Sequence, residues 1–242
     1  QQTRITALFP GERDPDGLRS DLIQALTDDI YRNLTLEVLE DQEWERSWLD
    51  HFKPMRFGQR LWICPTGHSV DEKEAVIIDL DPGLAFGTGT HPTTALCLEW
   101  LDSADIDGRS MIDFGCGSGI LAIAALKLGA RRADGTDHDP QAILASRDNA
   151  GKNSVSAKLQ LFGPGQSITE PTDIMLANIL SGTLIELVET VADLTKPGGD
   201  LLLSGILKEQ ADAVTAAYLP YFQLDTVLER DGWVLLHGIR LK

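Results

Sequence analysis

The segment Asp113-Phe114-Gly115-Cys116-Gly117-Ser118-Gly119-Ile120 indicates the fold class more clearly than any other part of the chain. It ends a strand-like run over 110–114 and opens an apolar, helix-like run over 120–128. Because glycine has no Cβ atom, a turn that contains three glycines lets the backbone pass close to a ligand. The helix that follows offers unpaired backbone N–H groups at its first turn. The stretch therefore predicts a strand–turn–helix unit with a ligand at the turn.

The spacing of these glycines separates two classes of cofactor. The dinucleotide fingerprint requires G-x-G-x-x-G, whereas this turn reads G-x-G-x-G and has Ile120 where the last glycine would stand. This departure disfavours a nicotinamide oxidoreductase. The turn resembles the first motif of S-adenosylmethionine methyltransferases, in which a D/E-x-G-x-G-x-G turn holds the methionine part of the cofactor.

The chain from about residue 60 onward alternates strand-like and helix-like segments, which is typical of a parallel sheet. We therefore predict an α/β fold, a Rossmann-like class I S-adenosylmethionine methyltransferase domain. The expected strands are 61–64, 75–80, 110–114, 133–136, 158–162, 173–177, 200–204, 224–230 and 233–240, and the expected helices are 93–101, 120–128, 141–150, 182–194 and 208–218.

Three zones make up the predicted domain organisation. Residues 1–40 read as strand, helix and strand, and they are too few to form a stable domain alone, so we interpret them as a small α+β N-terminal module. Residues 41–58 carry Trp44 and Trp48 at helical spacing and are interpreted as a linker helix. Residues 59–242 form the methyltransferase domain. The chain lacks an initiator Met, so we expect the natural protein to begin earlier.

Asp137 is the second candidate site residue. It stands at the end of the second strand of the Rossmann unit, about 20 residues beyond the glycines, where a carboxylate can accept both ribose hydroxyls. Asp137-His138-Asp139-Pro140 also reads as a helix start, so a capping or turn role is the alternative. With the glycine turn at this distance, ribose binding is favoured for Asp137 and helix capping for Asp139.

Asn178 follows the fourth strand of the same unit, and ligands of open α/β sheets lie beyond the carboxyl ends of the strands. Its amide can accept a hydrogen bond from a substrate amine or contact the cofactor, although a turn-forming asparagine is the alternative. The loop 81–94, DPGLAFGTGTHPTT, is not a Walker A loop. Its glycines suggest a mobile lid, and His91 is interpreted as structural rather than as a base.

Composition narrows the class of protein. The net charge of −16 argues against a sequence-independent nucleic-acid binder, which must neutralise phosphates, and is compatible with a basic protein partner. The three cysteines form no CxxC pair, so we expect a reducing compartment, a cytoplasmic protein and no metal site. No apolar run approaches the roughly 18 residues that span a bilayer, so we expect no membrane partner.

Four segments together, 81–94, 113–120, 135–140 and 177–180, resemble the bacterial methyltransferase family of large-subunit ribosomal protein eleven, the PrmA family. The resemblance extends over about 43–242, and the loop 81–94 is its most specific part. It implies a two-domain protein whose small N-terminal domain recognises the ribosomal protein. It also implies transfer of several methyl groups from S-adenosyl-L-methionine to lysine side chains and to the N-terminal α-amine.

The resemblance also implies roles for particular residues. Thr94, Gly115, Asp137 and Asn178 match the family's cofactor-binding residues, and Gly117 belongs to the same turn. Asn178 also matches the residue that faces the incoming amine, so it is our candidate catalytic residue. Residues 1–40 are shorter than the family's usual N-terminal domain. We expect the ribosomal protein as substrate, no direct contact with nucleic acid, and a monomer.

Two alternatives remain open at this point. One is a methyltransferase for another protein or for a nucleic-acid substrate. Such enzymes often carry Asn-Pro-Pro-Tyr at the fourth strand, and Asn178-Ile179-Leu180-Ser181 lacks the aromatic residue that would stack on a flat group. The other is a non-catalytic ribosome-assembly factor that binds the cofactor without turnover.

Overall fold

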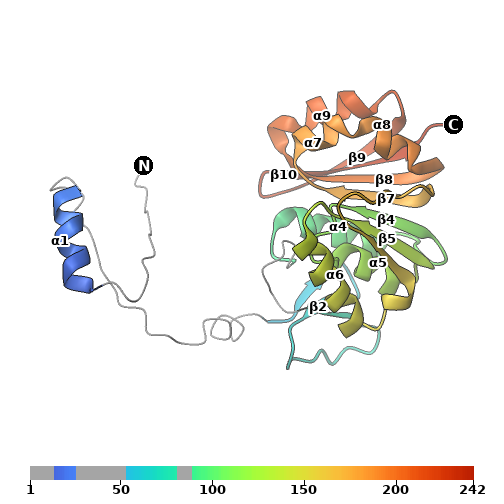
Figure 1. Cartoon of the computed structure of the whole chain (residues 1–242). Helices are drawn as coiled ribbons and strands as arrows, with labels where there is room; N and C mark the ends of the chain where they lie inside the picture. Colours follow the sequence, from blue (N-terminus) through green and yellow to red (C-terminus); the bar gives the residue numbers. More distant parts are fainter. Residues whose placement is uncertain (1–13, 26–52, 81–88) are drawn as a thin grey trace. The chain divides into compact units, whose positions relative to one another are not determined.

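The computed structural model describes residues 14–25, 53–80 and 89–242 (Figure 1). The chain divides into two compact units, Gln1–Asp50 and His51–Lys242. In the first unit the described element is helix α1 (Pro15–Ala25), which agrees with the helix predicted within residues 1–40. The two strands predicted within 1–40 lie outside the described residues, and the extent of an N-terminal module stays a prediction.

A seven-stranded sheet forms the centre of the second unit, in the order β6-β5-β4-β7-β8-β10-β9. The strands from β6 to β8 are parallel, and β10 is antiparallel to both of its neighbours. The strand order reverses direction at β4, and such a switch point is where open α/β sheets bind ligands. The strands are β4 (Ser110–Phe114), β5 (Arg132–Thr136), β6 (Leu159–Phe162), β7 (Thr172–Asn178), β8 (Thr195–Leu207), β9 (Phe222–Arg230) and β10 (Trp233–Arg240).

Helices cover both faces of this sheet (Figure 1). Neighbouring residues of β4 point to opposite faces, so Met111 joins the apolar cluster with α4 and α5 while Ile112 joins the cluster with α7, α8 and α9. The predicted Rossmann-like fold is therefore confirmed. The helices are α4 (Pro92–Ser103), α5 (Ile120–Lys127), α6 (Pro140–Lys152), α7 (Ser181–Glu186), α8 (Val188–Asp193) and α9 (Ala211–Tyr218), with short 3₁₀ turns η2 (Ser156–Lys158) and η3 (Lys208–Gln210).

The helix predicted over 182–194 is two short helices, because Leu187 ends α7 and begins α8 with non-helical backbone angles. Leu184, Val188 and Val191 are buried on both sides of this break. A break of one residue leaves the spacing of the apolar residues unchanged, so periodicity in the sequence could not reveal it.

A separate three-stranded sheet, β1-β2-β3, precedes α4. Strands β2 (Leu61–Cys64) and β3 (Val76–Asp79) are parallel to each other and correspond to the predicted strands 61–64 and 75–80. Strand β1 (Met55–Phe57) pairs antiparallel with β2. The prediction of a helix through residue 58 was therefore wrong at 55–57. Phe57 is buried in the core cluster, and strand geometry allows this burial while the backbone pairs with β2. The part of the predicted linker from 41 to 52 lies outside the described residues.

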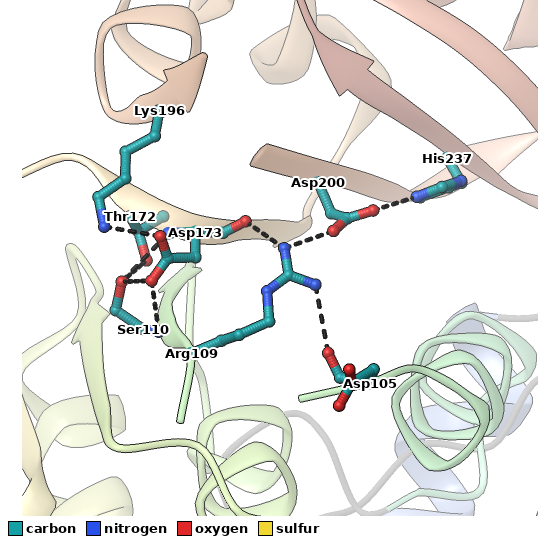
Figure 2. A network of polar contacts seen from close by, with 8 residues as sticks. All are labelled: Asp105, Arg109, Ser110, Thr172, Asp173, Lys196, Asp200 and His237. Atoms are coloured by element: carbon teal, nitrogen blue, oxygen red, sulfur yellow. Dashed lines mark hydrogen bonds and ion pairs between the residues drawn. The ribbon is translucent and has the colours of Figure 1, made fainter. Parts of the chain in front are cut away.

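A polar network ties the strands together at the amino edge of the sheet (Figure 2). The carboxylate of Asp173, on β7, accepts hydrogen bonds from the backbone N–H and hydroxyl of Ser110 on β4 at 2.9 and 2.7 Å. It also accepts one from Lys196 Nζ on β8 at 2.6 Å. Arg109 donates to the Asp173 carbonyl and to Asp200, which contacts His237 on β10. Desolvation raises the pKa of Asp173, but the bonds from Lys196 and Ser110 outweigh it and hold that pKa well below its usual value.

We expect Asp173→Asn to lower the free energy of unfolding at pH 7 by roughly 2 kcal/mol, because charge-assisted hydrogen bonds are lost. The folded pKa lies below the unfolded value of about 3.9, so the stabilisation is complete above that pH and declines as the pH falls through the folded pKa. The difference in urea unfolding between wild type and variant should therefore stay constant from pH 7 to about pH 5 and narrow progressively from there to pH 2.5. Asp107→Asn, at an exposed position of the same edge, is the control, and a constant difference across the pH range would contradict the prediction.

Candidate functional site

The register of the central strands brings the candidate site residues to one edge of the sheet. Phe114, the last residue of β4, pairs with Thr136 of β5 on one side and with Ala177 of β7 on the other. The next residues along the three chain segments are Gly115, Asp137 and Asn178. Because the strands are parallel, these residues follow at the same level at the carboxyl edge, and the structure brings them together as the sequence predicted.

The glycine turn is held closely by the protein around it. Gly115 has φ +79°, and a Cβ atom there would lie 2.3 Å from Ile179 Cγ2. A Cβ atom on Gly119 would lie 2.8 Å from the Ser146 hydroxyl of α6. Packing within the protein therefore requires glycine at both positions. This reason adds to the close approach of a ligand, which the sequence had suggested. The backbone N–H groups of Gly115 and Cys116 donate to the Thr136 carbonyl at 2.8 and 3.0 Å, which docks the turn on β5.

Asp137 connects the turn to the start of α6. Its Oδ2 accepts a hydrogen bond from the Gly117 N–H at 2.9 Å, and its Oδ1 accepts one from the Asp139 N–H at 3.0 Å. The side chain is 10% exposed. An ionised carboxylate has about four acceptor positions, so each oxygen retains capacity for a ribose hydroxyl. Asp139 accepts from the Gln141 N–H at 2.8 Å and caps α6, which confirms its predicted role.

Asp113 lies beneath the turn and is fully buried. Its Oδ2 accepts from the Ala122 N–H at 3.1 Å, which ties β4 to the first turn of α5, while its Oδ1 has no partner among the described residues. Burial raises the pKa of Asp113 to about 7, against the opposing effect of the Ala122 hydrogen bond. A buried polar atom without a hydrogen-bond partner lowers the stability of the folded protein. The Asp113 Oδ1 atom can therefore accept one further hydrogen bond below the turn.

Asn178 and Thr94 meet across the site from β7 and α4. The Asn178 Nδ2 atom donates to Thr94 Oγ1 at 3.4 Å, and Thr94 is 1% exposed. The Ser204 hydroxyl of β8 donates to the Thr93 carbonyl at 3.3 Å, which anchors the start of α4 on the sheet. The structure therefore brings the second pair of predicted cofactor-binding residues together.

His91 and Cys116 belong to residue types that often act as a base or a nucleophile, but their contacts here are structural. The imidazole of His91 caps α4 by accepting from the Thr93 N–H, and it lies edge-on to Trp233 with ring centroids 4.8 Å apart. Cys116 is buried within the turn, and burial raises the pKa of its thiol to about 12, so it is a poor nucleophile at neutral pH. Both observations favour structural roles, which the sequence had suggested for His91. Residues 81–88 of the predicted loop lie outside the described residues.

Sequence patterns did not identify the residues that contact the glycine turn and Ile179 from neighbouring elements. Ser146 and Asn149 of α6 hold the glycine turn, and Gly205 of β8 lies against the backbone of Ile179. Buried polar residues at positions i and i+3 of an amphipathic helix are the signal that could have identified the first two. Nothing in the sequence near Gly205 indicates which residue it contacts.

The residues at this edge fit S-adenosylmethionine. The Asp137 carboxylate retains acceptor capacity that suits ribose hydroxyls, the turn carries glycines in place of larger side chains, and the buried Asp113 Oδ1 lacks a partner among the described residues. Thr94, Gly115, Gly117, Asp137 and Asn178 line one edge of the central strands. The fold and this site define the class I S-adenosylmethionine-dependent methyltransferases.

Comparisons with known proteins agree with this class and refine it. The family model described as ribosomal protein L11 methyltransferase (PrmA) matches residues 1–240, and the chain belongs to that family. A ribosomal protein L11 methyltransferase of Pseudomonas putida (strain GB-1) is 56% identical over 239 residues, covering 98% of this chain and 82% of the relative. That of Methylococcus capsulatus (strain ATCC 33009 / NCIMB 11132 / Bath) is 52% identical over 240 residues, covering 99% and 82%.

Solved structures support the same assignment. The crystal structure of a ribosomal protein L11 methylase from Lactobacillus delbrueckii subsp. bulgaricus aligns with a TM-score of 0.72 and 29% identity, covering 79% of this chain and 99% of that one. A methyltransferase from Pyrococcus furiosus aligns with a TM-score of 0.58 at 15% identity, covering 68% of this chain and 90% of that one, and supports the fold alone. In the ranges that the structure describes, no helix combines the length and apolarity needed to cross a membrane.

Proposed function

We propose that this chain transfers methyl groups from S-adenosyl-L-methionine to amines of ribosomal protein L11, namely lysine side chains and the N-terminal α-amine, in the cytoplasm. The observation that carries the proposal is the juxtaposition of Asn178, which ends β7, with the glycine turn and Asp137 at one edge of the sheet. The names of the relatives support the ribosomal protein as substrate. The net charge of −16 favours encounter with a basic partner, and we propose that the enzyme acts as a monomer.

The bound cofactor supplies an activated methyl group on a sulfonium, so the protein has no need of a strong nucleophile of its own. The protein's task is to hold the amine roughly 3–3.5 Å from that methyl with its lone pair aligned. A lysine amine has a pKa of about 10.4 in water and is mostly protonated at neutral pH. Enclosure in a poorly solvated site favours the neutral form that can react.

Asn178 is the residue that we assign to amine orientation. Its Nδ2 atom donates to Thr94 Oγ1, and we assign its side-chain oxygen Oδ1, which has no hydrogen bond to a described residue, to accept an N–H from the incoming amine. Thr94 is buried in the first turn of α4 and fixes the orientation of the amide. An uncharged acceptor does not trap the protonated amine as a carboxylate would, and the proton released on methylation passes to solvent.

The test is methyl transfer from labelled cofactor to purified ribosomal protein L11, with the products mapped by mass spectrometry. We expect Asn178→Ala to lower kcat by roughly 100-fold, in the range that positioning contributes to catalysis. Thr183→Ala, at an exposed position on the adjoining α7, is the matched control and should leave turnover unchanged. Full turnover by Asn178→Ala would remove Asn178 from the mechanism, and absence of methylation by the wild type would overturn the proposed function.

A further inference from the structure

Helix α6 carries a line of three buried polar side chains, two of which contact the glycine turn. Ser146, Asn149 and Asn153 are 0%, 8% and 3% exposed. Their spacing of i, i+3 and i+7 places them on one face of the helix. Buried polar groups destabilise a protein unless they are hydrogen-bonded, so the partners of these side chains indicate what the face is for. We refer to these three residues as the α6 polar face.

The first partner is the cofactor turn itself. The Ser146 hydroxyl donates to the Gly117 carbonyl at 2.8 Å and lies 3.5 Å from the Cys116 thiol. The Asn149 Nδ2 atom donates to the Ser118 carbonyl at 2.9 Å. Two successive carbonyls of the glycine turn are thus fixed by two side chains from one helix. A glycine turn has large conformational freedom, and these bonds select one arrangement of it.

The second partner lies in the other sheet. The Asn153 Nδ2 atom donates to the Asn149 carbonyl at 2.9 Å and to the Asp79 carbonyl at 2.8 Å, and its Oδ1 accepts from the Asp79 N–H at 2.9 Å. Asp79 is the last residue of β3. The α6 polar face therefore connects the glycine turn to the end of β3 through a series of buried and part-buried hydrogen bonds. Residues 74 positions apart in sequence, Asp79 and Asn153, are joined by two of them.

We propose that the α6 polar face is a positioning element of the cofactor site, with Ser146 and Asn149 as positioning residues that hold the glycine turn in its binding conformation. Asn153 ties this element to β3. None of the three is proposed to touch the reacting atoms. The inference rests on the proposed function for the identity of the cofactor. It assigns to α6 a role in cofactor affinity that is separate from any contribution of α6 to the stability of the fold.

The experiment measures the Kd of S-adenosylmethionine and of S-adenosylhomocysteine by calorimetry, well below the unfolding temperature of each variant. We expect Ser146→Ala and Asn149→Ala each to raise both Kd values about tenfold, since one buried hydrogen bond to the turn is lost. Asn153→Ala should raise them by roughly threefold, because it acts through Asn149. With saturating cofactor, kcat should stay within about twofold of wild type, since a positioning residue for binding acts before the methyl-transfer step.

Two controls separate positioning from general destabilisation. Asp148→Ala lies on the exposed side of the same helix and should leave the Kd unchanged. Val214→Ala removes volume from the fully buried core on the opposite face of the sheet, so it lowers stability without reaching the turn. Cofactor affinities of Ser146→Ala and Asn149→Ala equal to those of wild type or of Val214→Ala overturn the inference. A wild type that binds no S-adenosylmethionine overturns the proposed function and the inference together, whereas binding without methylation of ribosomal protein L11 overturns the proposed function alone.

Discussion

Replacing Asp137 by alanine is expected to weaken S-adenosylmethionine binding by about 100-fold or more, the largest effect of any single change at this site. The carboxylate makes two sets of contacts, one to the ribose hydroxyls in our proposal and one to the Gly117 and Asp139 N–H groups in the structure. Hydrogen bonds to a charged acceptor contribute roughly 1.5–3 kcal/mol each, and about 1.4 kcal/mol corresponds to tenfold in affinity. The loss of the Gly117 contact also loosens the turn, which adds to the effect.

Calorimetric titration with S-adenosylmethionine, and with NAD in parallel, is the measurement. Asp139→Ala is the matched control, because this neighbouring aspartate caps α6 and its loss costs about 1 kcal/mol of stability while the cofactor affinity stays within about twofold. Asp137→Asn keeps one acceptor and should give an intermediate affinity. An Asp137→Ala protein that binds as tightly as wild type would show that the ribose is held elsewhere, and binding of NAD in preference would contradict the class of cofactor.

Gly205→Ala is expected to give the largest loss of stability, although Gly205 belongs to no recognised motif. The residue has φ +81°, and a Cβ atom there would lie 2.3 Å from the Ile179 carbonyl oxygen and 2.8 Å from its carbonyl carbon. The obstacle is backbone, so no side-chain rotation relieves it. Left-handed strain costs about 1–3 kcal/mol and overpacking a similar amount, so we expect a decrease in unfolding free energy of roughly 3–5 kcal/mol. Turnover should fall as well, because Ile179 directly follows Asn178.

Gly115→Ala provides the informative comparison for Gly205→Ala. A Cβ atom on Gly115 would lie 2.3 Å from Ile179 Cγ2, which is a side-chain atom, and this collision disappears in Ile179→Ala. We therefore expect Ile179→Ala to restore part of the stability lost in Gly115→Ala and none of that lost in Gly205→Ala. Gly198→Ala, also on β8 with φ +78°, has no described atom within 4 Å of its Cβ position and measures the left-handed strain alone. Thermal or urea unfolding of the single and double variants gives the coupling energies, and equal rescue in both pairs would contradict the geometry.

Patterns in the sequence predicted the alternation of strands and helices, the location of the glycine turn after 110–114, and the positions of Asp137 and Asn178. These features are local, because strand and helix periods and turn residues are written in consecutive positions. A parallel arrangement then requires that the residues after neighbouring strands lie at one edge. For this reason the strand pattern alone predicts that candidate site residues more than 60 positions apart in the chain, such as Gly115 and Asn178, meet at that edge.

The sequence did not reveal which side chains support the site, or that a break at Leu187 divides helix α7 from helix α8. Apolar periodicity gives the face that a segment buries but not the neighbour it buries against, so the contacts of Gly115 and Gly205 with Ile179 had no signal in the sequence. The same periodicity continues through Leu187, where the chain divides α7 from α8. The α6 polar face is visible in the sequence as spacing alone. Its hydrogen-bond partners lie on segments remote in sequence, and folding alone brings them within hydrogen-bonding distance.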